Sequence, residues 1–160
     1  MTISLGNDHA GFRLRASVLG LLRDMNLPVI DNGTRSEDPV DFPDIVALVC
    51  KDVLSGRADR GLLLCGTGVG ASMAANKYPG IRASVIHDCH SAHQGVEHDD
   101  MNVIAIGAQI VGPWLAKDII TTYLNARFAD TEELRRRLDK IAKLEAEVQK
   151  GAFGGPARSS

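Results

Sequence analysis

The sequence is poor in several features that would place a protein in a specialised class. It has three cysteines, Cys50, Cys65 and Cys89, and its first residues, MTISLGNDHAGF, lack the basic and apolar regions of a signal peptide. We therefore expect free thiols and a cytoplasmic protein, not a secreted domain held by disulfides. No apolar run approaches the roughly 20 residues that span a bilayer, so no membrane association is expected.

Neither sign of charge dominates the chain. Its 18 lysines and arginines face 20 aspartates and glutamates, which argues against a nucleic-acid partner that is bound by neutralising phosphates. With 160 residues and 44% hydrophobic residues, the chain suits one globular domain. We expect that domain to occupy residues 1–150, and the Gly-, Pro- and Ser-containing stretch 151–160 to be a disordered tail.

Short apolar runs alternate with segments in which apolar residues recur at helical spacing. The runs predict strands at 3–6, 28–30, 61–65, 81–86 and 102–106, with helices at 14–25, 45–54, 71–77 and 114–128 between and after them. Such alternation indicates parallel βαβ units, and hence a doubly wound α/β fold with a five-stranded parallel sheet. Ligands bind beyond the carboxyl ends of the strands in such sheets, where Asp8, His9 and Cys65 fall.

A last helix is predicted to begin after Asp130 or Thr131, either of which is a suitable N-cap. Its apolar stripe is narrow, as in a coiled coil, and consists of Leu134, Leu138, Ile141, Leu144 and Val148. The stripe fits a helix that packs on its own domain and equally a helix that docks on a second subunit. A basic cluster, Arg135 to Arg137, is either a solvated face or a source of one arginine for a neighbour's phosphate.

The strongest local signal is the segment from Cys65 to Ser72, CGTGVGAS, which follows the third predicted strand. Its three alternate glycines allow a tight turn that directs several backbone N–H groups inward, as a phosphate or an oxyanion requires. It is not a P-loop, because no Gly-Lys-Ser/Thr follows. Gly66, Gly68 and Ala71 also fit a dinucleotide fingerprint, with Asp88 at a suitable distance, although that motif normally opens the first βα unit.

Cys65 is the candidate nucleophile or base at this loop. The nearby N–H dipoles are expected to lower its thiol pKa and to favour the thiolate, although many free cysteines are merely buried apolar residues. Downstream, the run from His87 to His93, HDCHSAH, is either a histidine-rich helix start, which is the favoured interpretation, or a metal site. His98 stands beside carboxylates that suit acid–base work.

Taken together, these residues resemble the type B ribose-5-phosphate isomerase family, which includes galactose-6-phosphate isomerase subunits and related tetrose- and pentose-phosphate isomerases. The resemblance covers roughly residues 1–150. The matching stretches are Gly6–Phe12, Asp41–Pro43, Cys65–Gly70, Ala74–Lys77, Gly80–Ala83, and His98 through Asn102 to Gly107.

The resemblance implies isomerisation of an aldose phosphate to a ketose phosphate without metal or cofactor. Cys65 is then the base that moves a proton between C1 and C2, and Thr67 lies beside the reacting oxygens. His98 assists ring opening with Asp8 as its partner, and acts in the site of a neighbouring subunit of a homodimer or homotetramer. The candidate substrate-binding residues are His9, Gly66, Gly68, Val69, Gly70, Ser72, Asp99, Asn102, Arg136 and Arg137.

The chain departs from the family pattern at the positions that bear on the substrate. Asp99 stands where many members have asparagine, Gln109 where many have arginine, and Glu132 and Glu133 where a Gly-Gly-Arg-His pattern often ends. Ala71 replaces the glutamate that a second branch of the family uses, which leaves Cys65 as the base. The expected substrate is either ribose 5-phosphate or a shorter tetrulose phosphate. The alternatives are a sugar-phosphate or dinucleotide-binding module and a non-catalytic partner subunit.

Overall fold

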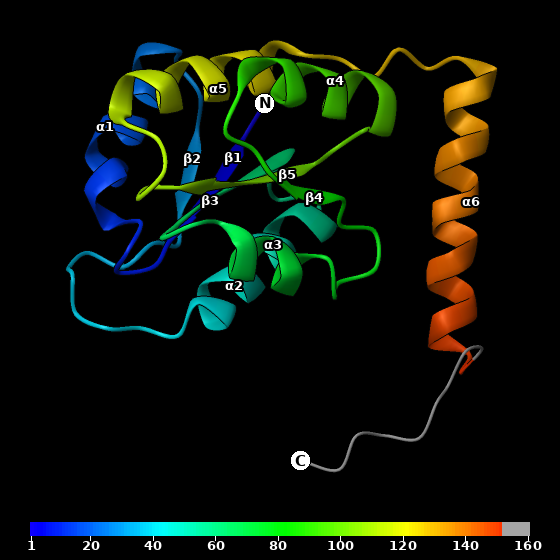
Figure 1. Cartoon of the computed structure of the whole chain (residues 1–160), viewed down its shortest axis with the longest axis horizontal. Coiled ribbons are helices and arrows are strands. Elements are labelled where there is room, and N and C mark those ends of the chain that lie inside the picture. The colour runs from blue at the N-terminus through cyan, green and yellow to red at the C-terminus, as the bar shows by residue number, and fades with distance from the viewer. Residues whose placement is uncertain (152–160) are drawn as a thin grey trace.

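A single parallel sheet forms the centre of the computed structural model, which describes residues 1–151. The strand order is β2-β1-β3-β5-β4, and all four strand pairs are parallel (Figure 1). The strands are β1 (Ile3–Asn7), β2 (Val29–Asp31), β3 (Arg60–Cys65), β4 (Ala83–Val85) and β5 (Val103–Gly107). The predicted doubly wound α/β fold with five parallel strands is confirmed.

Six helices connect and flank these strands. They are α1 (Phe12–Asp24), α2 (Phe42–Leu54), α3 (Val69–Ala75), α4 (Cys89–Asp99), α5 (Pro113–Asn125) and α6 (Glu132–Gln149). Helices α1, α4 and α5 share one core with the sheet, while α2 and α3 share another. Alternate residues of a strand face opposite sides, so Leu62 and Leu64 join the first core and Leu63 the second. Within residues 1–151, no helix is long and apolar enough to cross a membrane.

The strand predicted at 81–86 is shorter in the structure, which has β4 at Ala83–Val85. Two asparagine side chains bind the backbone before it. Arg82 donates its N–H to Asn102 Oδ1 at 2.8 Å, and Ala83 donates its N–H to Asn76 Oδ1 at 2.9 Å. Side chains thus take the places that strand partners would otherwise fill.

Helix α6 stands beside the α/β body, to which residues 126–131 join it (Figure 1). Of the two predicted caps, Thr131 is the N-cap, and its hydroxyl accepts the N–H of Leu134. Leu134 is buried, whereas Ile141, Leu144 and Val148 are 42–61% exposed. Most of the predicted apolar stripe is therefore left uncovered in one chain. Of the predicted tail, residues 152–160 lie outside the described part.

Candidate active site

The chain changes winding direction between β1 and β3, which are neighbours in the sheet although β2 lies between them in the sequence. Ligand sites of doubly wound folds lie at such a point, beyond the carboxyl ends of the strands. Asp8 follows β1 and Cys65 ends β3, so this edge of the sheet brings together two of the residues that the sequence predicts at the carboxyl ends of strands. Asp8 is 5% exposed and Cys65 is half-buried, and both line one small cavity.

Close contact between the start of α1 and the end of β3 holds Asp8 in place. The Asp8 N–H donates to Leu64 O at 3.2 Å, and Asp8 Oδ1 accepts the N–H of Gly11 at 2.8 Å. A Cβ at Gly11 would lie 2.0 Å from Leu64 O, so only glycine permits this approach. The carboxylate of Asp8 is thereby fixed beside the sulfur of Cys65.

The protonation state of Cys65 differs from the expectation drawn from its sequence. Burial raises the pKa of the thiol, and so do a hydrogen bond to the Asp8 carboxylate and the negative charge of that group. Backbone N–H groups of Gly68 and Gly66 act in the opposite direction, as predicted, but they are outweighed. The expected lowering of the pKa was therefore wrong, because the sequence does not show that Asp8 faces the sulfur. The raised pKa favours the thiol form of Cys65.

The segment Gly66–Gly70, called the cradle here, turns sharply away from β3. Gly68 has φ +82° and a Cβ there would lie 3.1 Å from Ala105 O, so the turn needs glycine for both reasons. No side chain caps the start of α3. Thr67 Oγ1 lies 3.4 Å from the N–H nitrogen of Val69, and both residues are exposed at the rim. The exposed hydroxyl of Thr67 and the backbone of the turn therefore lie beside Cys65.

Ser72 does not belong to this open rim. It is 9% exposed, and its hydroxyl lies 3.4 Å from Ala83 O, within the packing of α3 against β4. The hydroxyl of Ser72 is therefore used in packing and is not free to bind a ligand.

His9 lies at the same edge and has a defined tautomer. Its Nδ1 accepts the N–H of Val40 at 3.2 Å, so the neutral ring carries its proton on Nε2. The Nε2–H group remains available as a donor, as an anionic ligand requires. The contact also ties the loop before α2 to the site.

A cavity of about 440 Å³ adjoins the cradle on the side of α1 and α5. Gln109 separates the two, because its Oε1 lies 3.3 Å from the position of a Cβ on Gly66 and its side chain also lines the cavity. Arg13 also lines the cavity and donates a hydrogen bond to Ala108 O. No acidic side chain lines this cavity. Within residues 1–151 Arg13 has no ion-pair partner.

Arg13 is a candidate that the sequence argument missed. It lies in the first turn of α1, three positions after Ala10, whose Cβ also contacts the Gly66 site. That spacing from the Asp8–His9 pair was the available signal.

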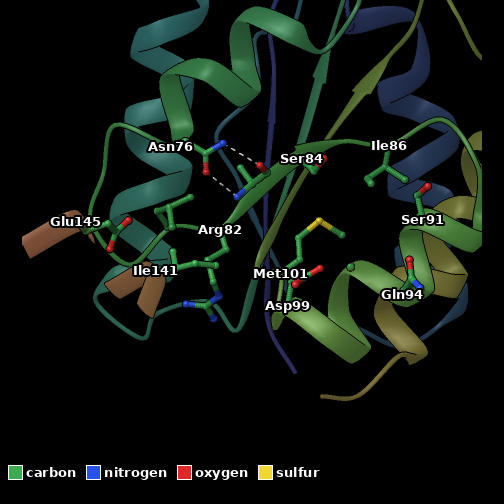
Figure 2. A pocket seen from close by; sticks show the side chains of 13 residues that line it. Asn76, Arg82, Ser84, Ile86, Ser91, Gln94, Asp99, Met101, Ile141 and Glu145 are labelled. Atoms are coloured by element: carbon green, nitrogen blue, oxygen red, sulfur yellow. Dashed lines mark hydrogen bonds between the residues drawn. The ribbon is translucent and has the colours of Figure 1, made fainter. Parts of the chain in front are cut away.

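The remaining candidates lie away from the cradle of the same chain. Helix α4 runs back from the carboxyl edge of the sheet, so His98, in its last turn, lies near the start of β5. The five residues of β5, which span roughly 13 Å, separate that edge from the residue that pairs with Cys65. Asp99 lines a different cavity of about 430 Å³, with Ser91 and Gln94 on one side and two α6 side chains on the other (Figure 2).

Asn102 and the arginines of α6 have local partners. Asn102 accepts the N–H of Arg82 and donates to Gly80 O at 2.9 Å, which makes it a brace for the turn before β4. Arg135 pairs with Asp130, and Arg137 with Glu133. Arg136 lines a shallow surface cavity on the same helix. One chain does not bring these residues to Cys65.

The histidine-rich stretch forms the start of α4, as the favoured interpretation predicts. Asp88 is the N-cap, and its Oδ1 accepts the N–H of Ser91 at 2.7 Å, which lowers the pKa of Asp88. His93 Nδ1 lies 3.2 Å from a Glu97 carboxylate oxygen. Within residues 1–151 no three His, Cys, Asp or Glu side chains converge as metal ligands would. Asp88 is thus occupied as a cap, not free for a ribose.

Comparison with known proteins gives consistent matches along the chain. Residues 3–141 match the family described as Ribose/Galactose Isomerase. Ribose-5-phosphate isomerase B of Escherichia coli is 40% identical over 143 residues, which are 89% of this chain and 95% of that protein. D-erythrulose-4-phosphate isomerase of Pectobacterium atrosepticum is 38% identical over 130 residues, 80% of this chain and 85% of that one. The structure of Clostridium thermocellum ribose-5-phosphate isomerase B superposes with a TM-score of 0.89 at 41% identity, covering 92% and 99% of the two chains.

Proposed function

Because this chain belongs to the Ribose/Galactose Isomerase family, we propose that it interconverts the aldose and ketose forms of a small phosphorylated sugar, with Cys65 as the base. The observation that carries this proposal is the meeting of Asp8 and Cys65 beside the cradle, at the switch point of the sheet. A base and a set of fixed N–H donors are the groups that proton transfer next to a carbonyl requires.

The reaction begins with the thiol proton. As the open-chain sugar enters, Cys65 gives its proton to the neighbouring Asp8 carboxylate. The thiolate then takes the proton from C2 of the aldose, and the C2–H electrons form the C1=C2 bond. The carbonyl electrons move to O1, where the N–H groups of the cradle stabilise the charge of the cis-enediolate.

The product forms by the reverse movement on the neighbouring carbon. The O2 hydroxyl gives up its proton, O1 gains one, and Cys65 delivers to C1 the proton that it took from C2. The thiolate then recovers its own proton from Asp8, which restores the starting state. We propose that Thr67, whose hydroxyl lies at the exposed rim of the cradle, relays the proton between the two oxygens. No electron leaves the sugar, so the step requires no redox cofactor. The reaction requires a reduced Cys65, which fits the cytoplasm.

The phosphate is proposed to lie on the side of His9 and Arg13. His9 offers an Nε2–H donor, and the adjoining cavity contains no carboxylate but does contain the Arg13 guanidinium, which has no ion-pair partner within residues 1–151. A four-carbon erythrose or erythrulose phosphate and a five-carbon ribose or ribulose 5-phosphate both fit this chemistry. Gln109 has a neutral amide, which can form hydrogen bonds with sugar hydroxyls and with phosphate oxygens.

A second copy of the chain is proposed to complete the site. His98 and Asp99 lie at the opposite edge of the sheet from Cys65 in one chain, so they reach a cradle only in a neighbour. The exposed apolar residues of α6 support a homodimer or homotetramer in which this helix packs on the partner, with Arg136 or Arg137 turned toward the partner's phosphate.

The reaction is tested with a panel of four-, five- and six-carbon aldose and ketose phosphates, scored by conversion. We expect turnover of a four- or five-carbon substrate by the purified chain alone. Cys65→Ser lowers kcat by about 10²–10⁴-fold without unfolding the protein, because it removes the base, while Cys89→Ser, on α4, leaves kcat near that of the wild type. Near-normal turnover by Cys65→Ser refutes the assignment. Tight NAD binding without any conversion favours the binding-module alternative.

The shared site is tested by mixing two inactive variants, Cys65→Ser and His98→Asn. Subunit exchange between homodimers gives mixed dimers with one intact site each, so activity returns to roughly a quarter of the wild-type value. Activity that stays at the level of the separate variants contradicts the sharing. The mass in solution, from light scattering, distinguishes dimer from tetramer.

A further inference from the structure

The edge of the sheet next to the cradle contains a backbone N–H group without a strand partner. Strand β4 ends at Val85, and the Ile86 N–H still donates to Ala105 O at 3.0 Å. The chain then turns away to α4, while β5 continues to Gly107. The side chain of His87 fills the place of the missing strand: its Nε2 accepts the Gly107 N–H at 3.0 Å.

Gly107 lies directly against the cradle. A Cβ on Gly107 would lie 2.8 Å from His87 Nε2 and 2.8 Å from the carbonyl oxygen of Thr67. A Cβ on Gly68 would in turn lie 3.4 Å from the Gly107 nitrogen. The end of β5 is therefore in close contact with the imidazole of His87 on one side and with the Thr67–Gly68 turn on the other.

The hydrogen bond defines the chemistry of His87. An imidazole nitrogen that accepts an N–H carries no proton, so the ring is neutral with its proton on Nδ1. The ring is half-buried and follows β4, so it ties the loop that leads to α4 to the end of the neighbouring strand. The sequence predicts His87 directly after a strand and within a histidine-rich run.

We propose that His87 is a positioning residue for the cradle: by accepting the Gly107 N–H it fixes the end of β5, against which Thr67 and Gly68 are set. This inference rests on the proposed isomerase function, because it concerns the N–H groups that would stabilise the enediolate. Charge on the sugar oxygen is largest at the transition state, so a small displacement of these donors lowers kcat more than it changes KM.

The test compares two substitutions at this position. His87→Gln keeps a carbonyl acceptor on a side chain of similar reach, whereas His87→Leu removes the acceptor. We expect His87→Leu to lower kcat by about tenfold with KM changed less than twofold, since a displaced donor costs less than the 10²–10³-fold loss of a deleted one. His87→Gln restores most of the lost turnover. His90→Leu, an exposed site on the first turn of α4, is the matched control.

Amide hydrogen exchange supplies a readout that does not depend on turnover. The Gly107 and Gly68 amides exchange faster in His87→Leu and return to wild-type protection in His87→Gln, while amides of β1 are unaffected. Equal loss of turnover in both variants overturns the proposal, since it indicates direct proton transfer by the ring. Faster exchange with unchanged kcat also overturns it. Wild-type conversion of sugar phosphates tests the proposed function separately, and amide protection tests the contact even where no conversion is found.

Discussion

The reactivity of Cys65 toward alkylation is the sharpest consequence of the contact with Asp8. Two of the three influences that raise the pKa of Cys65 come from Asp8, namely its hydrogen bond and its charge. Asp8→Asn removes the charge while an amide oxygen can still accept the Gly11 N–H. The opposing N–H groups of Gly66 and Gly68 remain in place. We therefore expect the pKa of Cys65 to fall in Asp8→Asn.

The size of the effect follows from the thiolate fraction. Below the pKa, each unit by which the pKa falls increases the thiolate about tenfold at a fixed pH. We expect iodoacetamide to alkylate Cys65 faster in Asp8→Asn than in wild type near neutral pH, where thiolate is the reacting form. The alkylation rate of the wild type rises with pH, because a raised pKa places the thiol-to-thiolate transition above the ordinary range.

The assay follows the Cys65 peptide by mass spectrometry over a range of pH, with Cys65→Ser as the background for the other two cysteines. Asp8→Asn also loses turnover, because the carboxylate that accepts the thiol proton is gone, so reactivity and activity change in opposite directions. A variant that is alkylated no faster than wild type, although folded, refutes the contact between the carboxylate and the sulfur as the cause of the raised pKa.

Three further outcomes are expected. Gly11→Ala places a Cβ 2.0 Å from Leu64 O, a backbone clash that no side-chain rotation relieves, so urea unfolding shows a loss of about 3 kcal/mol; a loss below half that value contradicts the close approach. Arg13→Gln raises KM for the sugar phosphate about tenfold with kcat unchanged, because it removes a charge-assisted hydrogen bond, whereas Arg23→Gln on the same helix leaves both constants unchanged. Burial raises the pKa of Cys50 from 9.0 to about 11, so the folded state retains the thiol proton at a pH where the unfolded state loses it. The free energy of unfolding is therefore expected to fall as pH rises from 9 toward 11, and this fall is absent in Cys50→Ala.

The sequence predicts the fold well where the signal is local. Uninterrupted apolar runs such as Leu62–Leu64 identify central strands, and the carboxyl ends of those strands place Asp8 and Cys65 at one edge. The late start of β4 is different, because it depends on the side chains of Asn76 and Asn102, whose oxygens accept the N–H groups of Ala83 and Arg82. A pattern of apolar residues contains no information on such contacts.

The directions in which the side chains of the site point could not be predicted from the sequence either. The raised pKa of Cys65 depends on which way the Asp8 carboxylate points, and the role of His87 depends on β5 being longer than β4. Arg13 is a charged residue on an exposed helix turn, a placement shared by many solvated arginines. Each of these features is a relation between segments that meet only in the folded chain.

The pairing of β1 with β3 has a consequence for how the protein acquires its chemistry. Asp8 and Cys65 belong to segments that a helix, a strand and a second helix separate, and they meet only when the two strands dock in register. Contacts of such large sequence separation form late relative to local helices. A nascent or partly folded chain therefore carries an ordinary cysteine, and the tuned sulfur appears only together with the completed sheet.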